Sequence, residues 1–186
     1  MATAAERGRE VRQRLLEAAA GLIAERGWTA VSTRLVAERA GVAAGLVHYH
    51  FTSVQALLSV AAVGVMRQAA GALGPALTQA RTPADAVHAL VASLDEFTGT
   101  DPVSMVFIES YLAATRDPQL RDAVAEVIAE FRTEVGRWLG ERGVPDPETT
   151  AAVLGSAIDG LVIQRALDPT LTAASVALVL TRLLTD

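Results

Sequence analysis

Apolar residues recur at intervals of three and four along most of the chain, which is the spacing of amphipathic helices. The stretch 118–142 shows this clearly, because Leu120, Val124 and Val127 begin an apolar stripe that charged residues oppose. The stretch 102–115 is apolar on every side, as expected of a helix in the centre of a protein. No strand pattern or internal repeat competes, so the sequence predicts an all-α protein.

Helix boundaries are marked by capping residues, several of which precede a proline, as in Thr82-Pro83 and Asp146-Pro147. Pro75 is expected to kink or end the fourth helix. The signals together predict nine helices, at about 6–26, 32–40, 43–50, 54–74, 83–98, 102–115, 118–142, 147–167 and 171–185.

Residues 32–51 have the spacing of a helix-turn-helix. Ser32 can cap the first helix, and Gly41 permits the positive φ of a tight turn. The second helix presents small or hydrogen-bonding side chains, so it fits a major groove, whereas a purely structural helix pair is the alternative. The candidate DNA-contacting residues are Ser32, Thr33, Arg34, Ala43, Ala44, Gly45, Leu46, His48, Tyr49, His50, Thr52 and Ser53.

Residues 14–58 resemble the N-terminal domain of the TetR family of bacterial transcriptional regulators. The resemblance is carried by the alanines of the first helix, Gly27-Trp28, the Ala-Gly-Val turn at 40–42, Gly45 and His50-Phe51. It implies a nine-helix architecture with two parts, which are a three-helix DNA-binding domain at 1–52 and a larger ligand-binding and dimerisation domain at 53–186.

Two positions depart from the family pattern. His48 stands where a tyrosine is common, and Val54 stands where a lysine is usual. Both usual residues serve phosphate contact in the family, so the departures bear on DNA affinity.

Charge separates the two ends of this chain of 186 residues, whose net charge is −5. Residues 1–52 carry seven arginines and five glutamates, and the remainder carries nine arginines and sixteen acidic residues. The end with the helix-turn-helix is therefore the basic one, as phosphate contact requires, although an ordinary solvated face has the same composition.

Composition also narrows the class of protein. The chain has no cysteine, which excludes disulfides and thiolate metal sites. The apolar part of the uncharged run 40–66 is too short to span a bilayer, and the N-terminus lacks a signal-peptide pattern. We therefore expect a cytoplasmic protein with no membrane partner.

The sequence gives little support for catalysis or metal binding. No phosphate loop, catalytic triad or metal-ligand cluster is present, and His48 and His50 face opposite sides of their helix. We expect no catalytic residue, no metal ion and no cofactor.

The last two predicted helices are apolar on more than one side, which a second copy of the chain could cover, and the resemblance implies a dimer through them. A monomer core is the alternative. The candidate interface residues are Leu154, Ile158, Leu161, Val176, Leu180 and Leu183.

The resemblance also implies a small-molecule pocket enclosed by the fourth to eighth helices. Bulky apolar residues with a few polar groups suit such a cavity, and Glu109 would favour a cationic ligand if it is unpaired. Plain core packing, with Glu109 paired to an arginine such as Arg137, is the alternative. The candidate pocket residues are Met66, Phe97, Met105, Phe107, Glu109, Tyr111, Trp138 and Gln164.

These observations favour a ligand-responsive repressor. A homodimer would bind double-stranded, palindromic operator DNA, and a small apolar or amphipathic effector would release it. The alternatives are a DNA-binding regulator or chromosome-associated factor without an effector, and a helical enzyme or scaffold with a vestigial helix-turn-helix.

Overall fold

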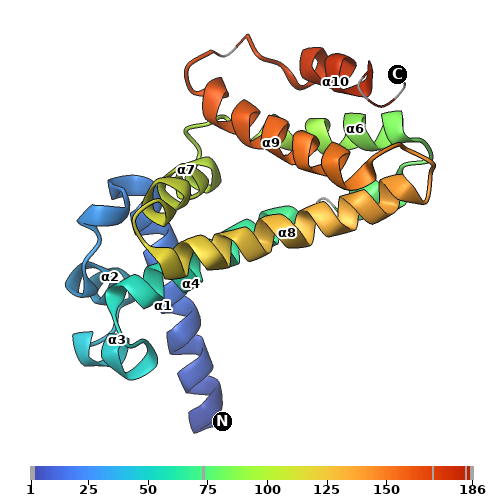
Figure 1. The fold of residues 1–186 in the computed structure, drawn as a ribbon. Helices are drawn as coiled ribbons and strands as arrows, with labels where there is room; N and C mark the ends of the chain where they lie inside the picture. The colour runs from blue at the N-terminus through green and yellow to red at the C-terminus, as the bar shows by residue number, and fades with distance from the viewer. Residues whose placement is uncertain (1–2, 73, 169, 183, 185–186) are drawn as a thin grey trace. The chain divides into compact units, whose positions relative to one another are not determined.

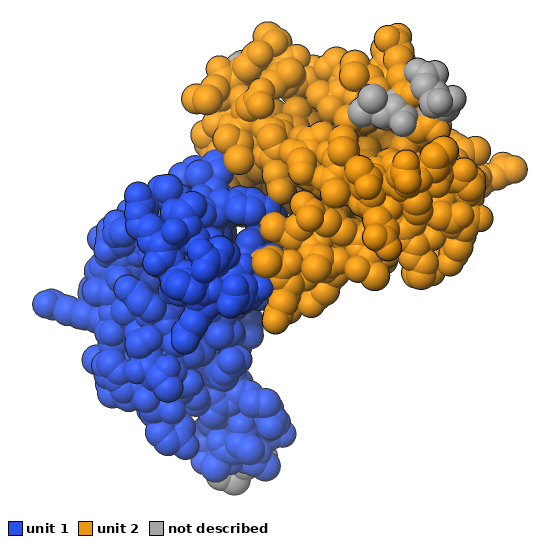
Figure 2. Space-filling model, in the orientation of Figure 1, with its two compact units in different colours: residues 1–66, 105–124 blue, residues 67–104, 125–186 orange. Residues whose placement is uncertain are grey.

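The computed structural model describes residues 3–72, 74–168, 170–182 and 184. The chain forms two compact units, shown in different colours in Figure 2. Unit 1 contains residues 1–66 and 105–124, and unit 2 contains residues 67–104 and 125–186. Two segments distant in the sequence therefore build unit 1, and each unit has a core of its own.

All regular structure in the described residues is helical, which confirms the predicted fold class (Figure 1). The elements are α1 (Ala4–Arg26), the 3-10 helix η1 (Trp28–Ala30), α2 (Thr33–Ala40), α3 (Ala44–His50), α4 (Val54–Gly71), α5 (Gly74–Gln79), α6 (Pro83–Ala92), the 3-10 helix η2 (Ser93–Glu96), α7 (Pro102–Ala114), α8 (Pro118–Gly140), α9 (Pro147–Arg165) and α10 (Ala173–Arg182).

Ten α-helices lie within the described ranges where the sequence predicts nine. The difference is α5, since Pro75 occupies its first turn and does not end α4. A proline in the first turn loses no helical hydrogen bond, because the N–H groups there have no helical acceptor. α4 itself ends at Gly71, three residues before the predicted end.

The core of unit 1 is built around α1. This helix packs against α2 and η1, and α2 packs against α3. The large side chains that these helices and α4 bury completely or nearly so are Leu15, Leu22, Ile23, Val36, Val47, Leu57, Leu58 and Met66.

α4 is the one described helix that is long and apolar enough to cross a membrane by length and composition. Core helices of globular proteins satisfy the same criterion. Here Leu57, Leu58, Ala62 and Met66 are buried in the chain itself.

The core of unit 2 brings together α6, α8, α9 and α10, and α10 packs along α6. Arg165 ties this unit together, since its guanidinium donates to the carbonyl oxygens of Leu94 and Phe97 and also bonds Asp95. Gly99 lies so close to α9 that an added Cβ would be 2.6 Å from the backbone nitrogen of Ala166. These contacts hold residues 94–99 against the C-terminal end of α9.

Candidate nucleic-acid interface and effector site

Helices α2 and α3 form the predicted helix-turn-helix within unit 1 (Figure 1). Ser32 caps α2, because its hydroxyl accepts from the Leu35 N–H at 3.4 Å. Gly41 adopts the left-handed conformation, with φ of 65°, and the Val42 N–H donates to the Ala37 carbonyl at 3.0 Å. These contacts end α2 and set the turn into α3, as the sequence predicts.

α3 presents a surface of small and hydrogen-bonding groups. Val47 is fully buried and holds the helix on unit 1, whereas Ala44, Gly45 and His48 are exposed. Tyr49 is 79% exposed, and its ring meets the half-buried His50 ring edge-on at 5.0 Å. A large aromatic side chain standing free on a short helix is available to contact base edges.

The polar candidate residues on either side of α3 are exposed or half-buried, which suits contact with a DNA backbone. Ser32 and Ser53 cap helices, and Arg34 carries a charge. Ser53 caps α4 by accepting from the Ala56 N–H at 3.0 Å, and Thr52 precedes it. At the other end of the motif Ser32 and Arg34 are exposed, and Thr33 is half-buried.

Several arginines of unit 1 serve its structure. Arg14 donates to the Ala40 carbonyl at the end of α2, and the Arg12 guanidinium lies 5.1 Å from the centre of the Phe51 ring. Arg39 forms a two-pronged pair with Glu25, whose pKa is held below its usual value by this hydrogen bond. Part of the positive charge of the N-terminal segment is therefore engaged in contacts within unit 1.

The first helix begins earlier than its predicted start at about residue 6. α1 begins at Ala4, because Thr3 and Glu6 form a reciprocal capping box. The hydrogen bond that the Thr3 N–H donates to the Glu6 carboxylate lowers the pKa of Glu6. The sequence contains the signal for this start, a threonine followed three residues later by a glutamate. Apolar spacing does not reveal it, because the capping box lies ahead of the apolar stripe.

Five of the eight candidate effector-site residues lie in unit 1. Met66 is buried, and Met105, Phe107 and Tyr111 are half-buried. Glu109 accepts a hydrogen bond from the backbone N–H of Trp28 at 2.7 Å. Its carboxylate therefore has a neutral donor as a partner in this structure, and a contact with a cationic ligand stays a prediction.

The other three candidate effector-site residues lie in unit 2. Trp138 is buried, with the Arg142 guanidinium 3.7 Å from the centre of its ring, while Phe97 is half-buried and Gln164 is exposed. Arg137, the suggested partner of Glu109, bonds Glu141 instead, at 3.0 Å. The effector site itself stays a prediction.

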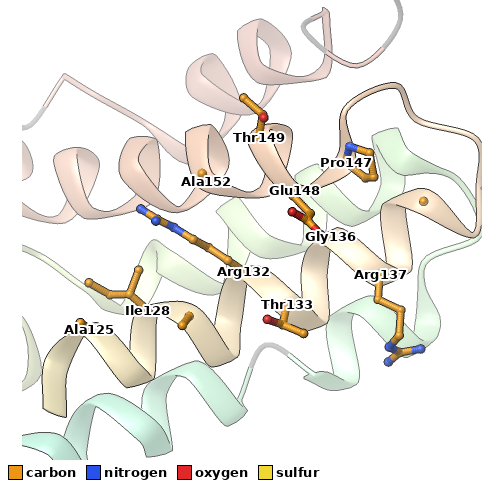
Figure 3. Close-up of a pocket in the computed structure, with 12 residues that line it drawn as sticks. Ala125, Ile128, Arg132, Thr133, Gly136, Arg137, Pro147, Glu148, Thr149 and Ala152 are labelled. Carbon is orange, nitrogen blue, oxygen red and sulfur yellow. The ribbon is translucent and has the colours of Figure 1, made fainter. Parts of the chain in front are cut away.

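Unit 2 carries a groove between α8 and the first turns of α9, with a volume of about 830 Å³. Within it Arg132 extends toward α9, whereas Arg137 points away (Figure 3). Its lining consists of Ala125, Ile128, Ala129, Arg132, Thr133, Gly136, Arg137, Gly140, Pro147, Glu148, Thr149 and Ala152. None of the candidate effector-site residues lines this groove.

The candidate dimer residues lie mostly inside unit 2. Leu154, Leu161 and Leu180 are buried in its core, and Ile158 and Val176 are half-buried against it. Leu183 lies outside the described residues. The apolar side chains that α9 and α10 leave exposed are others, namely Val153, Ile163, Leu178 and Val179.

Two family models match the chain. Residues 15–61 match the model described as bacterial regulatory proteins, tetR family. Residues 81–186 match the model described as tetracyclin repressor-like, C-terminal domain. The second match alone covers more than half of the chain.

Individual relatives agree with the family models. The HTH-type transcriptional regulator CymR of Pseudomonas putida is 27% identical over 168 residues, which cover 87% of this chain and 82% of CymR. The crystal structure of SCO7518 from Streptomyces coelicolor A3(2), provisionally named a transcriptional regulator, matches with a TM-score of 0.80 at 30% identity. It covers 95% of this chain and 99% of its own.

A third relative was solved with a small molecule. The multidrug binding protein EbrR, complexed with imidazole, has a TM-score of 0.72 and 32% identity. The match covers 93% of this chain and 94% of the EbrR chain.

Proposed function

Because the chain belongs to the TetR family of bacterial transcriptional regulators, we propose that it is a cytoplasmic repressor that a small molecule releases from its operator. The observation that carries the proposal is α3, a short helix held by Val47 that exposes small residues beside Leu46, His48 and Tyr49. Such a helix can enter a major groove deeply, and its exposed groups can meet base edges. We assign DNA contact to residues 1–52 and ligand binding and dimerisation to residues 53–186.

Dimerisation is supported by α9 and α10. On α9, Val153, Ser156, Gly160 and Ile163 are spaced by three and four residues and so share one face, opposite the buried Leu154 and Leu161. α10 adds the exposed Leu178 and Val179. Water-exposed apolar side chains on two helices of unit 2 suit a symmetric interface with a second copy, which would pair two recognition helices on a palindrome.

The effector is proposed to be small and apolar or amphipathic. Support comes from the apolar character of α7 and from EbrR, which is named for multidrug binding. The residues that the sequence predicts for ligand contact stay a prediction, and they are Met66, Phe97, Met105, Phe107, Glu109, Tyr111, Trp138 and Gln164. Glu109 stays among them, because one hydrogen bond from a backbone N–H leaves its carboxylate with further acceptor sites.

The proposal is tested by selecting duplexes from a random-sequence pool with the purified full chain. A repressor of this kind should enrich one palindromic sequence, and the enriched duplex should resemble a site next to the genes it controls. Affinity should fall steeply with added salt, because phosphate contacts release counterions. Enrichment of no sequence would overturn the proposal.

A further inference from the structure

The corner between α1 and η1 leaves one backbone N–H in need of an acceptor. The Gly27 N–H bonds the Ile23 carbonyl at 2.9 Å, and the Gly27 carbonyl receives the Ala30 N–H at 3.3 Å. The Trp28 N–H lies in the first turn of η1, where no helical carbonyl is in reach. Glu109 of α7 accepts its hydrogen bond at 2.7 Å, although 81 residues separate the two in sequence.

The Gly27 backbone lies close to the Glu109 carboxylate and has a conformation that favours glycine. Its φ is +78°, a conformation that side chains with a Cβ disfavour. A Cβ added there would lie 3.3 Å from each carboxylate oxygen of Glu109, tighter than ordinary van der Waals contact. The backbone and the carboxylate therefore meet at a distance that a glycine allows.

Glu109 is the only charged residue of the sequence between Pro102 and Ala114. It is half-buried on an otherwise uncharged and mostly apolar helix. A carboxylate that loses part of its hydration is stabilised only if donors replace the lost water. A hydrogen bond from a backbone N–H to an ionised carboxylate is of the stronger, charge-assisted kind.

The corner leads directly into the DNA-binding helices. Trp28 opens η1, and only the buried Val31 lies between the end of η1 and Ser32, the cap of α2. We propose that Glu109 is a positioning residue for DNA recognition, in that α7 uses this carboxylate to fix the direction in which α2 and α3 leave α1. The inference rests on the proposed function and assigns the residue a role in shaping the interface, without contact to DNA.

The test compares the full-length wild type with Glu109→Ala and Glu109→Gln. The probes are the duplex that the wild type selects from a random pool and an unrelated duplex of equal length. In Glu109→Ala we expect the Trp28 amide to exchange faster with solvent and affinity for the selected duplex to fall about tenfold. Affinity for the unrelated duplex should change by less than about twofold, because phosphate contacts dominate it.

Glu109→Gln keeps an acceptor oxygen without the charge, so its loss should be smaller, about threefold. Leu112→Ala, an exposed residue of the same helix, is the matched control and should behave as the wild type. A role limited to stability would lower the melting temperature and leave the preference for the selected duplex unchanged. If Glu109→Ala does not fold, the Gln variant decides by the same measure.

Two results would overturn the inference. One is an unchanged Trp28 amide exchange rate in the variants, which would mean that the hydrogen bond does not hold this corner. The other is wild-type preference for the selected duplex in both Glu109 variants. A wild type that selects no duplex would instead overturn the proposed function, and this inference with it.

Discussion

At the scale of single residues, the exposed groups of the helix-turn-helix fall into two kinds. The charged Arg34 side chain can contact backbone phosphates, which are the same in every sequence. The Tyr49 ring can approach base edges, which differ between sequences. His48, at a position where the family commonly has tyrosine, is exposed beside it. Affinity and selectivity should therefore depend on different side chains.

Replacing Arg34 with alanine should weaken binding to every duplex and lower the salt dependence by about one ion. Tyr49→Ala should instead reduce discrimination between the selected duplex and its variants, by about 1–3 kcal/mol at the contacted position. Fluorescence anisotropy across a salt series measures both effects. Arg132→Ala in unit 2 is the charge-matched control for Arg34, and Tyr49→Phe tests the ring without its hydroxyl. Equal losses on all duplexes for both alanine variants would contradict this division.

Glu109 shows where residue-level prediction from sequence stops. The sequence marks it as unusual, a lone charge on an apolar helix, and offers a ligand or an arginine as its partner. The partner is a backbone N–H far away in sequence. Periodicity reports which side chains are apolar, but it contains no information on which distant backbone groups remain without acceptors.

At the scale of helices, the sequence correctly predicts that most of the described helices form. The boundaries of α2, α3 and α7 agree within about a residue, because each has a local stop or start signal in Ser32, Gly41 or Pro102. The apolar faces of α9 and α10 are harder. The helices are apolar on several sides, so spacing alone could not tell the buried Leu161 from the exposed Ile163.

The start of α7 depends on a titrating cap. Partial burial would raise the pKa of Asp101, but hydrogen bonds from the Ser104 hydroxyl and N–H and from the Thr98 N–H outweigh it and hold the pKa below its usual value. A carboxyl with a lowered folded-state pKa contributes stability above its unfolded pKa and loses it as the pH falls through the folded value.

Asp101→Asn should therefore lower the melting temperature at pH 7, and the difference from the wild type should shrink as the pH falls below about 4. Asparagine can still cap a helix, so only the contribution of the charge is removed. Thermal unfolding at a series of pH values measures this. Asp122→Asn on the exposed side of α8 is the control. A difference that stays constant from pH 7 to 3 would show that the charge of Asp101 does not stabilise the fold.

At the scale of the whole chain, the two compact units are divided differently from the two predicted functional domains, whose boundary at residue 52 stays a prediction. Unit 1 extends through residue 66 and includes residues 105–124, so α7 and the start of α8 help to build it. This follows from packing between segments distant in sequence, which a reading of local signals cannot supply. The family resemblance, in contrast, is confirmed, because it depends on residues that are contiguous in the sequence.

Assembly is the remaining property of the whole molecule, and the exposed apolar side chains of α9 and α10 make it testable. Val153 and Leu178 are 48% and 55% exposed, so glutamate at either position can stay hydrated in an isolated chain and should leave the fold intact. In a dimer formed by these faces, the same charges would be unpaired and buried, at a cost of about several kcal/mol. Sedimentation should show a folded monomer for Val153→Glu/Leu178→Glu, with weakened binding to a palindromic duplex, because one chain can occupy only one half-site. Leu112→Glu on α7 is equally exposed and should remain dimeric, and Leu161→Glu should instead unfold unit 2, since Leu161 lies in its core. A double variant that stays dimeric and binds the palindrome with wild-type affinity would place the interface elsewhere.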